Sequence, residues 1–291
     1  MCGIVGYVGQ EQAAPILLDG LSRLEYRGYD SAGVAVYSQR DQSLSVYKSK
    51  GRLQVLSDML QGGAAVEGTI GVGHTRWATH GAPSDVNSHP QVSRSGRIAV
   101  VHNGIIENYL ELKKRLIAKG YVFKSETDTE VVTLLLDYYF DGDLLKALSR
   151  VMHRIEGSYA LGILNKDNPD EIIAARKSSP LVVGIGEDEF FLASDATPIV
   201  EYTDKVVYLE DEEIALIRRG EKLKVVNLKN VECPHEVKTV ALNLGQLEKG
   251  GYPHFMLKEI FEQPGCIHDC MRGRINVEGT NVVLSLSLIH I

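Results

Sequence analysis

The sequence predicts an α+β fold with antiparallel sheets, and three observations support this. Short strand-like segments are numerous, helical segments come in clusters, and the two kinds do not alternate strictly. A parallel α/β sheet needs that alternation, so antiparallel pairing is expected. With 291 residues, 44% of them hydrophobic, the chain can bury a sizeable core.

The first half of the chain begins with an apolar, glycine-spaced strand at 3–9. Apolar residues from Ile16 to Leu24 then follow helical spacing, and Pro15 suits the first turn of that helix. A turn-rich loop is expected at 27–33 and a longer loop at 77–96. The remaining predicted elements are strands at 32–37, 43–48, 69–76 and 97–104 and helices at 52–61 and 107–120.

Two more helices are expected after residue 126, one capped by Thr127 or Asp128 and running to Tyr139, and one at 143–154. Seven short strands follow between 158 and 226, and a further helix begins at 254. The polar, turn-rich segment between them indicates a linker. We therefore predict a domain at 1–226, a linker at 227–254 and a second unit at 255–291.

Charge and apolar patterning exclude several classes of partner. The net charge of −7 argues against a protein that binds a nucleic acid backbone. The N-terminus lacks the basic region of a signal peptide, and the longest apolar runs are too short to span a bilayer. The four cysteines do not form the pattern of a disulfide framework. We expect a soluble cytoplasmic protein without a nucleic acid or membrane partner.

Cys2 is the first candidate nucleophile, because removal of Met1 would give it a free α-amine beside its thiol. An α-amine with a pKa of about 7.7–8.0 is a base near neutral pH, and it can take the proton of the neighbouring thiol. A nucleophile and its base on the same terminal residue are the features of an N-terminal nucleophile. The alternative is a small cysteine buried at the start of a strand.

Asn103 and Gly104, in VHNG, end a strand-like segment. An asparagine amide and a backbone N–H can together form an oxyanion hole for acyl transfer. The alternative is a simple Asn-Gly turn. Asp128, in TDTE, offers a carboxylate for a substrate ammonium, or else it caps the helix that follows.

The segment 73–81, GHTRWATHG, contains groups suited to bind a carboxylate. Arg76 can grip it with two parallel hydrogen bonds, Thr79 and His80 can add donors, and Trp77 can act as a lid. The bland alternative is a surface loop with a buried tryptophan. A metal site is the other alternative, but neither His74, His80, His89 and His102 nor the late group Cys233, His235, Cys266, His268 and Cys270 fits a metal motif.

Taken together, these candidates define one kind of site, with a nucleophile that carries its own base, an oxyanion hole, and clamps for both charged ends of an α-amino acid. Glutamine has the carboxylate, the ammonium and the side-chain amide that such a site requires. No metal and no organic cofactor is needed for this chemistry.

Seven runs of the sequence, in order over about 240 residues, carry a family resemblance: CGIVGYVG (2–9), LSRLEYRGYDSAGVAVY (21–37), GHTRWATHGAP (73–83), VHNGIIENY (101–109), TDTEVV (127–132), GSYAL (157–161) and ASDATPIVEYTD (193–204). They resemble the glutaminase half of the glutamine–fructose-6-phosphate aminotransferase family, whose members are class II glutamine amidotransferases. KGGYPHFMLKEIFEQP (249–264) resembles the junction with the sugar-isomerase half of that family.

The resemblance implies the N-terminal-nucleophile hydrolase fold, a four-layer αββα sandwich of two antiparallel sheets between helical layers. It also implies that Cys2 attacks the amide carbon of glutamine, with its α-amine as base. Arg27 and Gly28 would position this terminal residue. Asn103 and the Gly104 N–H would hold the oxyanion.

The same resemblance implies the contacts of the two charged ends of glutamine. Arg76, Thr79 and His80 would bind the carboxylate, and Asp128 with the carbonyl of Gly104 would bind the ammonium. Trp77 would gate the tunnel that carries ammonia to the second half.

Two features depart from the family pattern. The loop reads Asn87-Ser88-His89-Pro90-Gln91, with Gln91 where members often have histidine. An isomerase half should follow residue 255, but only its first helix or so is present, so we interpret the chain as a truncated reading frame. It would then release ammonia from glutamine, whereas a full-length homodimer would use fructose 6-phosphate to make glucosamine 6-phosphate.

Two alternative functions stay open at this point. One is the glutaminase half of another class II enzyme, such as amidophosphoribosyltransferase or asparagine synthase. The other is a non-catalytic module that binds an amino acid or a partner protein, which retention of Met1 would favour.

Overall fold

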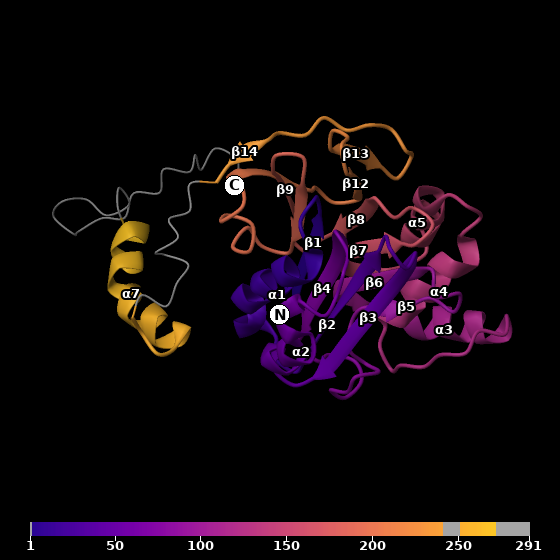
Figure 1. Ribbon diagram of the computed structural model, residues 1–291, viewed down its shortest axis with the longest axis horizontal. Helices are drawn as coiled ribbons and strands as arrows, with labels where there is room; N and C mark the ends of the chain where they lie inside the picture. Colours follow the sequence, from indigo (N-terminus) through magenta and orange to yellow (C-terminus); the bar gives the residue numbers. More distant parts are fainter. Residues whose placement is uncertain (1, 241–250, 272–291) are drawn as a thin grey trace, which may run out of the picture. The chain divides into compact units, whose positions relative to one another are not determined.

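The structure, a computed structural model, describes residues 2–240 and 251–271. It divides into two compact units, Met1–Ala241 and Leu242–Ile291, which are described separately (Figure 1). In the second unit the described element is the helix α7 (Phe255–Met271). The division falls within the range 227–254 that the sequence suggests as a linker, and the domain assignment itself stays a prediction.

The larger sheet of the first unit has eight strands, all paired antiparallel. Its order is β14-β11-β9-β10-β1-β4-β2-β3, so β1 lies in its interior between β10 and β4. The bounds are β1 (Gly3–Val8), β2 (Ser31–Ser38), β3 (Ser43–Lys50), β4 (Ile70–Arg76), β9 (Val182–Ile185), β10 (Phe190–Ala193), β11 (Lys205–Tyr208) and β14 (Lys238–Thr239).

The second sheet has six strands, again antiparallel, in the order β13-β12-β8-β7-β6-β5. The bounds are β5 (Gln91–Val92), β6 (Ile98–Ile106), β7 (Gly157–Asn165), β8 (Glu171–Lys177), β12 (Glu213–Arg218) and β13 (Lys224–Asn227). Apolar residues from both sheets form one buried cluster between them, which includes Val72 of β4 and Val101 of β6.

Helices cover the outer face of each sheet. The helices α1 (Ala13–Leu24) and α2 (Leu53–Met59) share a buried cluster with the eight-stranded sheet. The helices α3 (Tyr109–Ala118), α4 (Thr129–Tyr139) and α5 (Leu144–Met152) pack on the six-stranded sheet (Figure 1). Short 3₁₀ turns occupy Glu25–Arg27 and Gln61–Gly63. The first unit is therefore a four-layer αββα sandwich, as predicted.

Sequence periodicity explains how this sandwich builds a site. Along β4, Ile70 and Val72 belong to the cluster between the sheets, and His74 follows at the next alternate position. Along β6, Ala99 and Val101 lie in the same cluster, and Asn103 follows them. Because side chains two apart in a strand share a face, both polar residues project into the space between the sheets.

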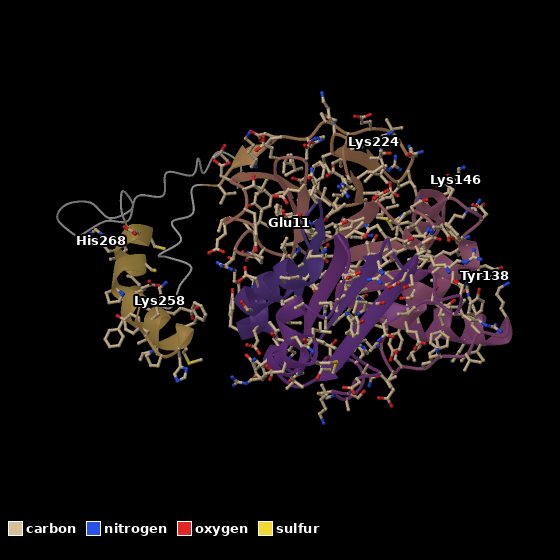
Figure 2. The ribbon with its side chains drawn as sticks, in the orientation of Figure 1. Glu11, Tyr138, Lys146, Lys224, Lys258 and His268 are labelled. Carbon is tan, nitrogen blue, oxygen red and sulfur yellow. The ribbon has the colours of Figure 1, made fainter. Side chains whose placement is uncertain are left out.

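The helices that cover the sheets present polar side chains on their outer sides, as expected for helices with one apolar face. Tyr138 and Lys146 lie on the outer sides of α4 and α5 (Figure 2), and their exposed fractions are 39% for Tyr138 and 64% for the Lys146 side chain. Within the described ranges, no helix has the length and the apolar character that crossing a membrane requires.

Candidate active site

Cys2 stands immediately before β1, beside the end of β4. Its Sγ accepts a hydrogen bond from the backbone N–H of Trp77 at 3.2 Å and lies 3.5 Å from the carbonyl oxygen of the same residue. Gly3 pairs with Thr75, which fixes Cys2 at the point where β4 gives way to the loop 77–96. Cys2 is half-buried, so the alternative of a small cysteine buried at the start of a strand is met only in part.

The environment of Cys2 favours the thiol form. Burial raises the pKa of the Cys2 thiol above its ordinary value, and the hydrogen bond from Trp77 and the Arg76 cation only partly oppose this. At neutral pH the sulfur therefore holds its proton in this state. A nucleophilic role needs a base close by, and an α-amine on the same residue meets that need.

Asn103 lies in the second sheet but faces Cys2. Its Nδ2 donates to the backbone carbonyl of Cys2 at 3.1 Å, and its Oδ1 lies 3.0 Å from Nε2 of His74. Asn103 and Gly104 are both inside β6, so the interpretation as an Asn-Gly turn is wrong. Gly104 has a φ of 123°, and a Cβ there would lie 2.0 Å from the carbonyl oxygen of Ser158, so only glycine fits.

Arg27 is the last residue of the 3₁₀ turn Glu25–Arg27, and Gly28 follows it directly, three residues before β2 begins. Arg27 forms an ion pair with Asp195, next to Ser194, whose Oγ accepts from the N–H of Ile4 at 3.1 Å. A Cβ on Gly28 would lie 2.8 Å from the carbonyl carbon of Arg76, so the two backbones can approach this closely only with glycine. Arg27 thus pairs with the residue next to the Ser194 that binds β1, and Gly28 packs against the Arg76–Trp77 backbone that contacts Cys2.

Arg76 is the last residue of β4, and its side chain is buried. Its Nη2 donates to the carbonyls of His80 and, at 3.1 Å, of Gly81. Its Nη1 is buried and has no hydrogen-bond partner within the described part of the chain. A guanidinium keeps its charge in proteins, so this unpaired group is suited to an anion.

Trp77, Thr79 and His80 follow in the loop. Trp77 is 45% exposed, so the expectation of a buried tryptophan is wrong, and its ring meets Tyr29 edge to face with centroids 5.6 Å apart. The His80 ring packs on Tyr109 at 5.1 Å. Thr79 is exposed, and of these three residues the structure brings only Trp77 into contact with Cys2.

Asp128 occupies the N-cap position of α4, but its side chain does not cap the helix. Instead its Oδ2 accepts the backbone N–H of Ile106 in β6 at 2.8 Å, and the residue is buried. The capping interpretation is therefore wrong. Glu130, in the first turn, accepts the N–H groups of Lys124 and Ser125 at 2.8 and 2.6 Å and so holds the loop that presents Asp128.

Sequence reasoning did not single out Asp30 or assign His74 a role. Asp30 accepts the N–H of Ala78 at 2.8 Å and thereby anchors the start of the loop 77–96. Its position within the RGYDSAG run was the available signal. Gln91, the residue that departs from the family pattern, is buried and donates to the carbonyls of Val86 and Ser88 at 3.1 and 2.9 Å.

Three of the four clustered histidines, His74, His89 and His102, have their rings close together, and His74 among them contacts Asn103. The rings of His74 and His89 have centroids 4.2 Å apart, and those of His89 and His102 lie 6.4 Å apart. In residues 2–240 and 251–271 no group of three or more His, Cys, Asp or Glu side chains could hold a metal ion. The late cysteines Cys266 and Cys270 are exposed and free on α7.

These buried histidines predict acid lability. Burial lowers the pKa of His74 to about 3, and burial also lowers the pKa values of His89 and His102. In the unfolded chain an imidazole titrates near about 6.5, so the unfolded state binds more protons between the two pKa values. The free energy of unfolding should therefore rise with pH across this window, by up to about 1.4 kcal/mol per pH unit for each histidine.

Urea titrations between about pH 5 and pH 7 measure this slope. A His74→Gln variant should have a smaller slope, by about one proton. An unfolding free energy that does not vary with pH in this range would show that the three imidazoles are not neutral in the folded domain.

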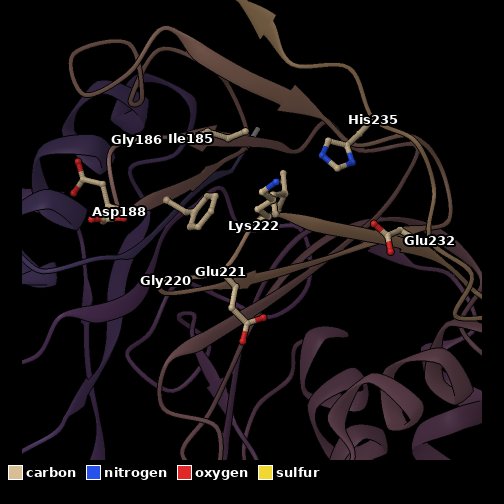
Figure 3. Close-up of a pocket in the computed structure, with 11 residues that line it drawn as sticks. Ile185, Gly186, Asp188, Gly220, Glu221, Lys222, Glu232 and His235 are labelled. Atoms are coloured by element: carbon tan, nitrogen blue, oxygen red, sulfur yellow. The ribbon is translucent and has the colours of Figure 1, made fainter.

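Figure 3 shows a separate pocket of about 590 Å³. The pairing of Phe190 with Val8 places this pocket at the opposite end of β1 from Cys2. Phe190, which pairs with Val8 at that end, is one of its lining residues, along with Lys222 and His235. No residue of the predicted site lines this pocket. This pocket is therefore separate from the cluster around Cys2, which remains the candidate site.

The fold corresponds to that of a known class of protein. A family model described as a glutamine amidotransferase domain matches residues 74–201. The solved glutamine phosphoribosylpyrophosphate amidotransferase from B. subtilis, complexed with ADP and GMP, superposes with a TM-score of 0.67 at 27% identity, covering 78% of this chain and 49% of that chain. The chain is similar to glutamine amidotransferases, and the predicted N-terminal-nucleophile type of sandwich is confirmed.

Within that class the sequence is similar to glutamine–fructose-6-phosphate aminotransferases [isomerizing]. It is 66% identical to the protein of Bacteroides thetaiotaomicron over 98% of this chain and 47% of that protein. It is 57% identical to the protein of Caldanaerobacter subterraneus subsp. tengcongensis over 98% of this chain and 46% of that protein. The chain thus spans about half the length of these relatives and corresponds to their N-terminal half.

Proposed function

We propose that this chain hydrolyses glutamine to glutamate and ammonia through a thioester on Cys2. One observation carries the proposal: the Cys2 residue of one sheet and the Asn103 amide of the other meet at a single point, with Nδ2 of Asn103 3.1 Å from the carbonyl of Cys2. A nucleophile and an oxyanion donor that converge from separate layers are what acyl transfer requires.

The reaction begins once Met1 has been removed. The α-amine of Cys2 takes the thiol proton while the sulfur attacks the amide carbon of glutamine, and the carbonyl oxygen becomes an oxyanion. The Asn103 amide and the Gly104 N–H stabilise this charge. The carbon–nitrogen bond then breaks, the amine returns its proton to the leaving group, and ammonia departs. Water hydrolyses the thioester to glutamate and regenerates the thiol.

The neighbouring residues hold and orient the substrate. The unpaired, buried Nη1 of Arg76 supports its assignment to the glutamine carboxylate, with Thr79 and His80 as further donors. The buried Asp128 carboxylate and the Gly104 carbonyl receive the ammonium. Arg27 and Gly28 position the terminal residue.

In the complete protein we propose that ammonia passes a gate at Trp77 and reaches fructose 6-phosphate, so that glucosamine 6-phosphate is formed. Identities of 66% and 57% with glutamine–fructose-6-phosphate aminotransferases favour this acceptor. The 27% identity with the phosphoribosylpyrophosphate enzyme supports the alternative acceptor class less strongly. We also propose a homodimeric assembly for the complete protein, located in the cytoplasm.

Intact-mass measurement before and after incubation with 6-diazo-5-oxo-norleucine, a glutamine-analogue electrophile, tests the proposal. We expect the mass of a chain that lacks Met1, followed by a single adduct on Cys2. Loss of Met1 without an adduct would show that the glutamine pocket does not form in this chain. Retention of Met1 would leave the amine blocked and favour the non-catalytic alternative.

The Asp128→Asn variant is expected to raise the KM for glutamine by about tenfold to a hundredfold, with a smaller effect on kcat. A hydrogen bond to a charged group contributes about 1.5–3 kcal/mol, and asparagine keeps the bond from Ile106 while losing the charge. Steady-state kinetics with glutamine as the varied substrate measure this change in KM. The Asp143→Asn variant is the control, because Asp143 caps α5 through the N–H of Lys146. An equal KM in both variants would remove Asp128 from the ammonium site.

A further inference from the structure

His74 joins the two sheets at the site. It stands on β4, and its Nε2 lies 3.0 Å from the carbonyl oxygen of His102 and 3.0 Å from Oδ1 of Asn103, both on β6. The residue is fully buried. The nucleophile belongs to the sheet of β4 and the oxyanion donor to the sheet of β6, so His74 bridges the two halves of the site.

The two acceptors determine the chemical form of this imidazole. A carbonyl oxygen and a carboxamide oxygen both accept, so Nε2 must carry the hydrogen. Nδ1 is buried and has no partner within the described residues, as suits a nitrogen without a proton. Burial holds the pKa of His74 at about 3, so the ring stays neutral and donates through Nε2 alone.

This donor distinguishes the two orientations of the Asn103 amide. In the observed orientation Oδ1 accepts from His74 and Nδ2 donates to the Cys2 carbonyl. A half-turn of the amide would direct its N–H groups at the Nε2–H of His74 and its oxygen at the carbonyl of Cys2. Both contacts would then be repulsive, and at the fully buried His74 ring no water can take the place of the lost hydrogen bond.

We propose that His74 is a positioning residue that locks the Asn103 amide with its N–H groups toward Cys2, and so keeps the oxyanion donor ready. The inference rests on the proposed function, because it gives Asn103 the role of oxyanion donor. The hydrogen bonds that His74 makes are to His102 and Asn103. Its effect should therefore appear in kcat and depend on Asn103.

Two substitutions at His74 separate the donor from the bulk of the ring. Glutamine can place an N–H near the position of Nε2, whereas the shorter asparagine reaches only the position of Nδ1. We expect His74→Asn to lower kcat by about tenfold to a hundredfold, a part of the 10²–10³ loss typical of a missing oxyanion donor, with KM within about threefold. His74→Gln should keep kcat within about threefold of the unchanged chain.

A double-mutant cycle with Asn103→Ala tests whether His74 acts through Asn103. If it does, His74→Asn should have no further effect on kcat once Asn103 is alanine. A structural role would lower kcat in both backgrounds. His89→Asn is the matched control, since it alters the neighbouring buried ring and leaves the bond to Asn103 in place. It is expected to lower the midpoint of urea unfolding while kcat per folded molecule is retained.

The outcomes distinguish this inference from the proposed function. Loss of activity in Asn103→Ala together with normal kcat in His74→Asn would overturn the inference and leave the proposed function standing. Equal loss in both Asn103 backgrounds would overturn it as well. A chain whose hydrolysis is insensitive to Asn103→Ala, or that hydrolyses no glutamine, would overturn both.

Discussion

Replacement of Cys2 by alanine is expected to reduce glutamine hydrolysis to the background of the assay, because the reaction loses its only proposed nucleophile. The fold should persist. The Cys2 side chain is half-buried, and its hydrogen bonds are to the backbone of Trp77 alone. Its truncation should therefore change the free energy of unfolding by about 1 kcal/mol or less.

Ammonia release and urea unfolding measured on the same preparations test this expectation. Cys233→Ala is the matched control, since Cys233 is another free, half-buried thiol and lies outside the candidate site. It should retain full activity. Hydrolysis by Cys2→Ala at the rate of the unchanged chain would show that another group attacks the amide.

Replacement of Asn103 by alanine is expected to lower kcat by about 10²–10³, with KM for glutamine changed less than about threefold. The physical reason is that the amide meets charge that exists only after the sulfur has attacked. The ground-state carbonyl of glutamine gains little from it, so binding is expected to be nearly unaffected.

Asn108→Ala is a suitable control, because Asn108 lies in the same segment but donates to the carbonyl of Arg154 at 2.8 Å. It should lower stability slightly and leave kcat unchanged. If Asn103→Ala instead raised KM and kept kcat, the amide would bind the substrate and not the oxyanion, and the role assigned to it would be wrong.

Much of the fold could be predicted from periodicity. The apolar strand at 3–9 corresponds to β1, and the helices expected at 107–120 and 143–154 correspond to α3 and α5. The two-residue strands β5 and β14 could not be predicted, because two residues show no alternation and pair only where a neighbouring strand is already in place. Local pattern therefore predicts the long elements and not the short ones.

The site shows the same division between local and tertiary information. Asn103-Gly104 has the composition of a turn, yet β7 pairs with this segment and keeps it in a strand. Asp128 has the position of a cap, yet the N–H of Ile106 in β6 takes its carboxylate. Both segments have a local conformational preference, for a turn and for a helix cap, and their contacts with the six-stranded sheet override it. The roles of Cys2, Arg76 and Asp128 remain predictions that the variants above test.

His74 shows the limit of motif reasoning. As one of four nearby histidines it suggested only a metal site, and nothing in GHTRWATHG indicates that its ring faces Asn103. The decisive information is that β4 and β6 lie in different sheets whose inner faces meet. A single sequence does not show which strands pair with one another, so it does not reveal that β4 and β6 face each other from different sheets.

Because the site is divided between two sheets, the packing of the core between them determines the distance from Cys2 to Asn103. Side chains such as Val72, Ala99 and Ala160 fill the layer that separates the sheet of Cys2 from the sheet of Asn103. Protein interiors are packed as densely as crystals, and added volume forces side chains off their rotamers and shifts the backbone. A methyl group added in this layer is expected to alter the distance between the nucleophile and the oxyanion donor. Residues that never meet glutamine thereby set the gap across which its amide is broken.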